Sequence, residues 1–179
     1  MNEYSFYEKI KSWDYGYLNL KNSKRITGKH LNDFENYILI GNERFEKEKI
    51  GTCWDFTMYG ADVFKNNFSY DYKLWYFMKD NADTHTWLSY KKDKDIKAFE
   101  VAWKDYSGIH SFDSERIMTD FYIGDTEEYF LINFNEFDCT GMTPSQFMLK
   151  ILQSGQLYRG SEELYNEWLI KLKGDVLDE

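Results

Sequence analysis

The sequence predicts an α+β domain that combines several helices with an antiparallel β-sheet. Three observations lead to this fold class. Apolar residues recur at helical spacing from Trp54 to Phe64, aromatic-rich extended segments follow one another between residues 70 and 103, and two amphipathic patterns occupy residues 143–174. We therefore expect helices at both ends of the chain, with the sheet between them.

The length favours one domain. The chain has 179 residues, enough for a single hydrophobic core without disulfides or a structural metal. Aromatic residues make up 20% of the sequence, and their burial offsets the ordering entropy despite the low mean hydropathy. We expect residues 1–179 to form one domain, with residues 50–138 as its central part and residues 143–174 as a C-terminal helical pair.

Charge and cysteine content narrow the classes of function. There are 22 Lys and Arg against 31 Asp and Glu, and the net charge of −9 argues against nucleic acid or an anionic membrane as a partner. Cys53 and Cys139 are far apart and lack metal-site spacing, so we expect free thiols, no metal and no cofactor. The N-terminus shows no basic and apolar leader, which favours a cytoplasmic protein.

The segments before residue 50 carry weak signals. Residues 4–13 show helical spacing, and residues 14–28 contain turn-forming residues that predict an irregular approach to the core. A second helix is predicted over residues 31–40, and residues 42–49 are expected to form a solvated connector or one exposed helical turn. His30 has no recognisable partner and is interpreted as a surface or capping residue.

The segment Gly51-Thr52-Cys53-Trp54 starts the central helix. Thr52 is a good N-cap, which places Cys53 at the first helical position, and the pattern ends at Asn66-Asn67. A helix N-terminus presents unpaired N–H groups and the positive end of the dipole. These features favour a thiolate and stabilise an oxyanion.

The sheet is predicted from aromatic-rich segments and charged turns. Strands are expected at residues 70–78, at residues 84–90 and from residue 95 or 96 to residue 103. A two-residue turn at Lys92-Asp93 would pair Tyr90 with Asp95 and set His85 directly opposite Glu100, with Cβ atoms roughly 5 Å apart. A slip of one residue would move Glu100 to the other face.

The rest of the chain carries clearer boundaries. A short extended segment at residues 109–112 precedes a helix at residues 115–122, and residues 129–137 alternate as a strand. Thr143 with Pro144 begins one C-terminal helix, and Ser161 begins a second that is expected to end near residue 174. We interpret this helical pair as closing the core.

Cys53, His85 and Glu100 together have the composition of a thiol catalytic site. A cysteine at a helix start is by itself a weak signal, because free cysteines are often small buried hydrophobes. A histidine on a strand and a carboxylate in register with it supply the base and the orienting group that thiol catalysis requires.

These residues lie in segments that resemble a known family. Gly51-Thr52-Cys53-Trp54, Thr84-His85-Thr86-Trp87-Leu88, Phe99-Glu100-Val101-Ala102-Trp103 and Tyr106-Ser107-Gly108-Ile109-His110 are similar to segments of the transglutaminase-like superfamily, in particular its small bacterial and mobile-element members. The resemblance covers residues 50–113. It implies a papain-related core with Cys53 as nucleophile, His85 as base and Glu100 as orienting acid, where the family more often has aspartate.

Alternative assignments stay open at this stage. His110 is a rival base, and Asp105 or Asp113 would replace Glu100 if the register differs. Trp54 and Trp87 flank the pair in sequence and either wall a substrate groove or pack in the core.

The resemblance implies acyl transfer or amide hydrolysis on a protein or peptide, by a peptidase, a deamidase or a cross-linking enzyme. The alternative is a catalytically silent domain of the same fold that acts as an acidic protein-interaction module, as a phage or mobile element would use.

Overall fold

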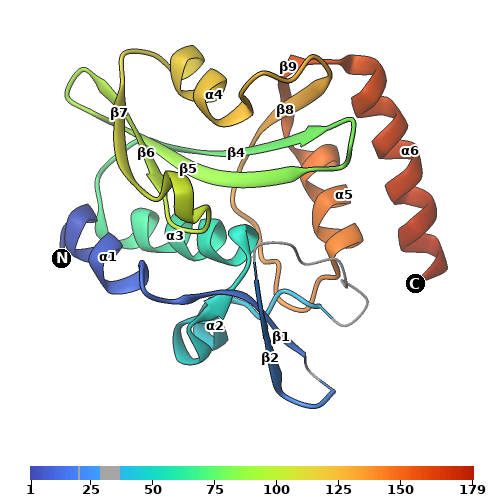
Figure 1. Ribbon diagram of the computed structural model, residues 1–179, viewed down its shortest axis with the longest axis horizontal. Helices are drawn as coiled ribbons and strands as arrows, with labels where there is room; N and C mark the ends of the chain where they lie inside the picture. The colour runs from blue at the N-terminus through green and yellow to red at the C-terminus, as the bar shows by residue number, and fades with distance from the viewer. Residues whose placement is uncertain (20, 29–36) are drawn as a thin grey trace.

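The chain folds as an α+β domain with two sheets. The computed structural model describes residues 1–19, 21–28 and 37–179 (Figure 1). Within these residues, six strands form an antiparallel sheet in the order β7-β6-β5-β4-β8-β9, and three form a smaller sheet in the order β2-β1-β3. The predicted fold class is confirmed.

Most strands of the larger sheet follow the aromatic-rich segments. Its strands are β4 (Tyr72–Lys79), β5 (Thr84–Lys92), β6 (Asp95–Glu100), β7 (Gly108–Phe112), β8 (Tyr129–Phe134) and β9 (Gln156–Gly160). β6 and β8 each end three residues before their predicted ends. β9 was not predicted, because its five residues, which follow Gly155 and end at Gly160, are too few to show a period.

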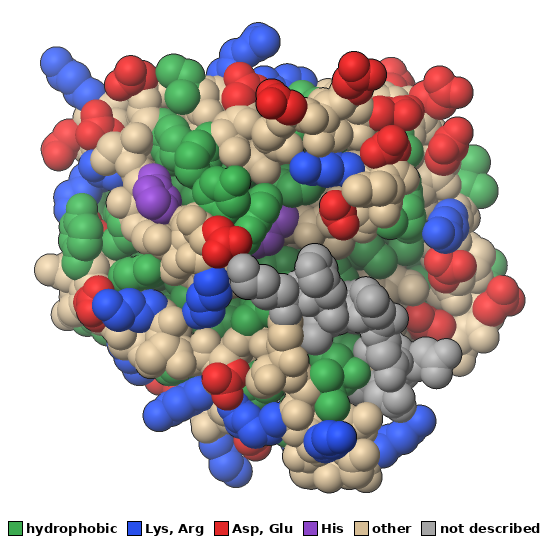
Figure 2. All heavy atoms as spheres, in the orientation of Figure 1, with side chains coloured by type: hydrophobic (Ala, Val, Ile, Leu, Met, Phe, Trp, Pro, Cys, Tyr) green, Lys and Arg blue, Asp and Glu red, His purple; other side chains and the backbone are tan. Residues whose placement is uncertain are grey.

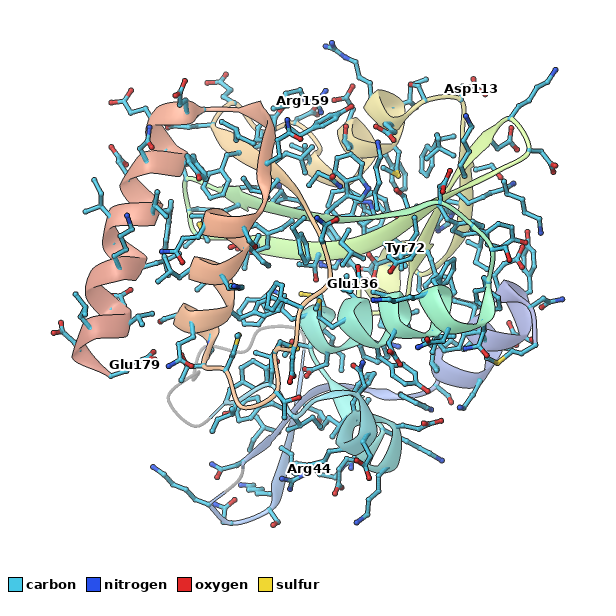
Figure 3. All side chains as sticks on the ribbon, turned by 180° about the vertical axis from the view of Figure 1, so that it is seen from behind. Arg44, Tyr72, Asp113, Glu136, Arg159 and Glu179 are labelled. Atoms are coloured by element: carbon cyan, nitrogen blue, oxygen red, sulfur yellow. The ribbon has the colours of Figure 1, made fainter. Side chains whose placement is uncertain are left out.

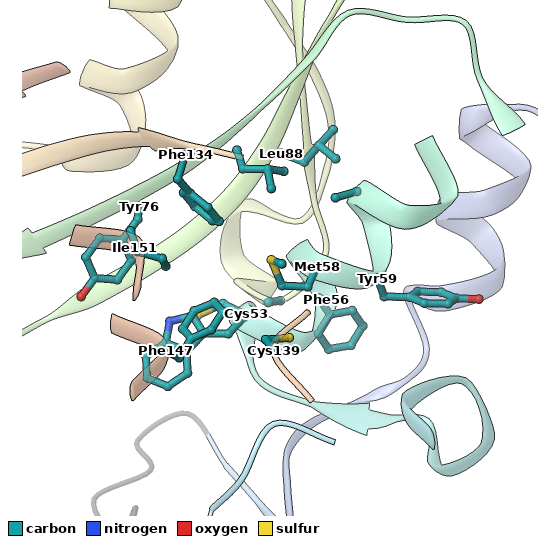
Figure 4. Packing of buried hydrophobic residues seen from close by; sticks show 14 of the residues in the cluster. Cys53, Phe56, Met58, Tyr59, Tyr76, Leu88, Phe134, Cys139, Phe147 and Ile151 are labelled. Carbon is teal, nitrogen blue, oxygen red and sulfur yellow. The ribbon is translucent and has the colours of Figure 1, made fainter. Parts of the chain in front are cut away.

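Helices cover both faces of the larger sheet. Helix α3 (Cys53–Asn67) packs on one face, and α4 (Glu115–Ile123) covers the other (Figure 1). Figure 4 shows Met58 of α3 between the helix and the strands that carry Leu88 and Phe134. On the opposite face, Met118 and Tyr122 of α4 pack with a smaller group of buried residues. Because α3 and α4 bury the two faces of the sheet, the sheet is held in a fixed position relative to the start of α3.

The smaller sheet lies where turns were predicted. β1 (Asp14–Asn19) pairs antiparallel with β2 (Lys24–Thr27) and parallel with the two-residue β3 (Ile50–Gly51). The prediction of an irregular segment at residues 14–18 was wrong. Gly16 is a close-approach residue of a strand and not a turn residue, since a Cβ atom there would lie 2.0 Å from the Ile26 carbonyl oxygen.

The helices before Cys53 differ in part from the prediction. α1 (Glu3–Ile10) agrees with the first pattern and is capped by Asn2. Residues 42–49 are not primarily a connector: α2 (Asn42–Glu48) is a helix that buries Phe45. Most of the helix predicted over residues 31–40 lies outside the described residues, and residues 37–40 are not helical.

The predicted hairpin register is wrong by two residues. β5 and β6 pair Lys92 with Asp95 and Leu88 with Phe99, so the turn is Asp93-Lys94 and not Lys92-Asp93. Asp93 has φ 58°, a left-handed conformation that Asp tolerates better than Lys because its short side chain bonds locally. A shift of two residues keeps every side chain on its predicted face.

The C-terminal helices agree with their caps. α5 (Pro144–Ser154) begins after Thr143, whose hydroxyl accepts a hydrogen bond from the Gln146 N–H, and α6 (Glu162–Asp178) begins after Ser161. α6 continues past Gly174, the predicted end. Both helices pack against β8 and each other. No helix in the described part of the chain has the length and apolarity needed to cross a membrane.

Candidate active site

The start of α3 is fixed by a buried polar network. The Thr52 N–H donates to the Asp55 Oδ2 atom at 2.9 Å, and the Tyr37 hydroxyl donates to the same oxygen at 2.7 Å. Burial raises the pKa of Asp55, and these hydrogen bonds oppose that rise. Gly51 permits the close approach, since a Cβ atom there would lie 2.6 Å from the Asp55 Cβ atom. The network defines where the helix begins and therefore where Cys53 lies.

His85 and Glu100 form a buried pair. The His85 Nε2 atom lies 2.6 Å from the Glu100 Oε2 atom, and the two residues are 7% and 2% exposed. The other carboxylate oxygen, Oε1, accepts a hydrogen bond of 2.9 Å from the Trp103 N–H. With both oxygens bound, the carboxylate has a fixed orientation, and it holds the imidazole ring in turn.

The pairing of His85 with Glu100 is diagonal. Trp87 is the residue of β5 that the register places opposite Glu100, two residues along from His85. Side chains at diagonal positions on one face remain within reach when they are long, as Glu and His are. The sequence predicts that His85 and Glu100 lie directly opposite each other, whereas in the structure they meet from diagonal positions.

β5 and β6 separate at the end that carries this pair. Their ladder ends at Leu88 and Phe99, whereas β5 stays paired with β4 as far as Thr84. Cys53 belongs to the core on the α3 face, and the neighbours of His85 on β5 and β4 belong to the α4 face. At this end of the sheet His85 interacts electrostatically with Cys53, which helps to raise the pKa of the ring. Since Nε2 is bound to Glu100, Nδ1 is the ring nitrogen available to the sulfur.

The surroundings of His85 favour its charged form. Burial alone would lower its pKa, but the charge of Glu100 and the hydrogen bonds with Cys53 and Glu100 outweigh this and raise the pKa to about 10. The ring also contacts Trp103, with centroids 5.0 Å apart. At neutral pH the ring is an imidazolium, which is the form that stabilises a neighbouring thiolate.

A cavity of about 600 Å³ opens beside this pair. His85, Tyr15 and Trp103 line it, together with Gly28, Phe77, Lys79, Asp83, Thr84, Ala102, Lys104 and Asp105. Its wall combines aromatic rings with two lysines and two aspartates, and the face of the molecule shown in Figure 2 likewise intersperses hydrophobic, acidic and basic side chains. Cys53 is 4% exposed and is not among the lining residues.

The alternative bases and acids lie elsewhere. The Nε2 atom of His110 on β7 lies 2.8 Å from the Tyr106 carbonyl oxygen, and β6 separates β7 from β5. Asp105 lies on the cavity wall, and Asp113 is exposed between β7 and α4, at the periphery of the molecule in Figure 3. None of the three takes the position that His85 or Glu100 occupies.

Trp54 and Trp87 are core residues in this structure. They are 3% and 1% exposed; Trp54 packs near Phe147 with ring centroids 5.2 Å apart, and neither lines the cavity. The indole among the lining residues is Trp103, which is half-buried. Its position follows from its backbone bond to Glu100, a contact that no local sequence pattern indicates.

Tyr15 is the site residue that sequence reasoning missed. It lines the cavity beside His85, and the charge and polar groups of Cys53 act on its hydroxyl. β1 positions it by parallel pairing of Tyr15 with Gly51, two residues before Cys53. Parallel pairing between residues so far apart leaves no pattern in the local sequence. In addition, Gly16 is typical of a turn, although it lies in a strand here.

The described residues contain no group of three or more His, Cys, Asp or Glu side chains that could hold a metal ion. The site chemistry available to them is that of a thiol, an imidazolium, a carboxylate and a phenol. No family model, curated protein or solved structure matches this chain.

Proposed function

We propose that this protein is a thiol-dependent acyltransferase or amide hydrolase of the transglutaminase-like kind. Cys53 is its nucleophile, His85 its acid and base, and Glu100 the residue that orients His85. The observation that carries the proposal is the contact of one imidazole ring with both the Glu100 carboxylate, at 2.6 Å, and the Cys53 thiol at the start of α3.

In the first half of the reaction, the Cys53 thiolate adds to the carbonyl carbon of an amide. A carbon–sulfur bond forms, and the carbonyl π electrons move onto oxygen. The His85 imidazolium then donates its proton to the amide nitrogen, the carbon–nitrogen bond breaks, and the amine leaves. The product is a thioester on Cys53.

The second half transfers the acyl group. Neutral His85 takes a proton from water or from a primary amine, and the conjugate nucleophile displaces the Cys53 sulfur from the thioester. Water gives hydrolysis or deamidation, and an amine gives cross-linking. Glu100 stabilises the imidazolium in both halves because its carboxylate is fixed by the Trp103 N–H.

The cavity suits a segment of polypeptide. Its volume of about 600 Å³ is in the range of sites that bind a small ligand or one or two side chains. The aromatic wall of Phe77 and Trp103 accepts an aliphatic chain, and the mixed charges of Lys79 and Asp83 accept polar main-chain or side-chain groups.

A test uses denatured casein with a fluorescent primary amine. We expect the wild-type protein to release peptides, release ammonia or incorporate the fluorophore, and Cys53→Ala to do none of these. The acyl intermediate is tested with p-nitrophenyl acetate, which acylates an activated thiol without specific recognition. If Cys53 is acetylated no faster in the wild type than in His85→Ala, the proposal fails.

A protein-interaction role without catalysis is the competing function. The observation that favours it is the 4% exposure of Cys53, which leaves little of the thiol open to a substrate. The acetylation test separates the two functions, because a silent scaffold requires no His85-dependent reactivity at Cys53.

A further inference from the structure

Tyr15 lies between the cavity and the nucleophile. It lines the cavity beside His85, whereas Cys53 does not, and the charge and polar groups of Cys53 act on its hydroxyl. The phenol is therefore close both to the cavity and to the nucleophile.

The position of Tyr15 is set by the backbone. β1 pairs Tyr15 with Gly51 in the same strand pair that leads directly into Thr52 and Cys53. A residue held by a ladder to the segment before the nucleophile keeps its distance from it. The phenol is therefore part of the frame that holds Cys53, and not a side chain on an independent loop.

The chemistry of the phenol fits a donor. Burial, together with the charges of Cys53 and Glu100, raises the pKa of Tyr15 far above its ordinary value. The hydroxyl therefore keeps its proton at every working pH. A neutral O–H beside a backbone N–H, both close to the nucleophile, is the donor pair that an oxyanion requires.

We propose that the Tyr15 hydroxyl is the second donor of the oxyanion site, acting with the backbone N–H of Cys53 on the tetrahedral intermediate. This rests on the acyl-transfer function proposed above. On attack the oxyanion forms one bond away from the carbon that joins sulfur, and the hydroxyl close to Cys53 donates to it.

The reaction of the thiol with p-nitrophenyl acetate passes through such an oxyanion. The thiolate adds to the carbonyl carbon, the π electrons become the oxyanion that Tyr15 and the Cys53 N–H stabilise, and the carbon–oxygen bond then breaks to release p-nitrophenolate. Alkylation by iodoacetamide also consumes the thiolate, but it displaces iodide from a saturated carbon and forms no oxyanion. Comparing the two reactions isolates the contribution of the donor.

The test measures both rates at Cys53 in wild type, Tyr15→Phe and Tyr165→Phe. Tyr165 is the matched control: its hydroxyl donates to the Leu152 carbonyl oxygen on the C-terminal helices, 2.8 Å away. We expect the ratio of acetylation to alkylation to fall by about 10²-fold in Tyr15→Phe, the usual loss for one oxyanion donor. The ratio stays at the wild-type value in Tyr165→Phe.

Other results would overturn either the role of Tyr15 or the acyl-transfer function itself. An unchanged ratio in Tyr15→Phe overturns the proposal, and so does an equal fall in both rates, because the phenol then acts on the thiol itself. If wild-type Cys53 is acetylated no faster than Cys139, the acyl-transfer function fails first. Partial unfolding of Tyr15→Phe is recognised by faster alkylation of Cys139, and the ratio at Cys53 is then measured below the melting temperature of the variant.

Discussion

Cys53 and Cys139 are buried to nearly the same extent, with 4% and 5% of their surface exposed, but their surroundings differ. Cys53 opens a 15-residue helix and contacts the charged ring of His85. Cys139 follows β8, and burial together with the charges of Asp55 and Asp138 raises its pKa to about 12.

Exposure to solvent does not distinguish the two thiols. Cys139 lines a hollow of about 350 Å³, and Cys53 is not among the residues that line the cavity beside His85. The neighbours of a thiol, and not its burial, therefore mark a candidate nucleophile: an imidazolium favours the thiolate, and carboxylates disfavour it.

The largest effect is expected from removing the imidazole. His85→Ala should lower the acetylation rate of Cys53 by about 10²- to 10⁴-fold, because it removes the group that stabilises the thiolate. Cys53 then resembles Cys139, and the contrast between the two thiols disappears. Stopped-flow release of p-nitrophenolate measures the rate. A loss of less than about threefold would remove His85 from the mechanism.

A smaller loss is expected when the imidazole remains but its partner loses its charge. Glu100→Gln keeps the shape of the side chain and an acceptor for the Trp103 N–H, but removes the charge that raises the pKa of His85. We expect acetylation at pH 7 to fall by about 10²-fold. NMR titration of the ring should show a lower pKa than in the wild type. Unchanged values of both would contradict the orienting role.

The contribution of His85 to the free energy of unfolding should depend on pH. The pKa of His85 rises from 6.5 to about 10 on folding, so its contribution to stability is complete below pH 6.5 and is lost as the pH rises through about 10. The difference in unfolding free energy between wild type and His85→Gln should shrink over this window, by at most about 1.4 kcal/mol per pH unit. Urea denaturation at several pH values measures it. A constant difference would show that the ring is not charged.

The smallest effect is expected at the second thiol. Cys139→Ala removes a buried sulfur and should cost about 1 kcal/mol of stability. It should leave acetylation of Cys53 at the wild-type rate, since Cys139 has no part in the proposed site. Thermal unfolding and the acetylation assay measure the two quantities. A tenfold loss of acetylation would mean that Cys139 supports the site.

Sequence reasoning was accurate where the signals are local. The N-caps Thr52, Thr143 and Ser161 each mark a helix start, because capping depends on residues within one turn. The same local evidence singled out Cys53. Alternation also placed His85 and Glu100 on one face, and this survived an incorrect register because the error was two residues and not one.

Sequence reasoning failed where strands far apart pair. The parallel ladder of Tyr15 with Gly51 joins residues 36 positions apart and leaves no periodic trace, so Tyr15 was interpreted as part of a turn. The β5–β6 ladder ends at Leu88 and Phe99, beside the His85–Glu100 pair, and this end also has no local signature in the sequence. The resemblance to the transglutaminase-like superfamily covers residues 50–113, so it also gave no information on Tyr15.

The most direct test of the central claim is the alkylation of the two cysteines by iodoacetamide at pH 7, followed by peptide mass spectrometry in wild type and His85→Ala. We predict that Cys53 reacts at least about 10²-fold faster than Cys139 in the wild type, although the two thiols are buried to nearly the same extent, and that His85→Ala removes most of this advantage. Equal rates at the two thiols, or an advantage of Cys53 that persists in His85→Ala, would contradict a Cys53–His85 catalytic pair.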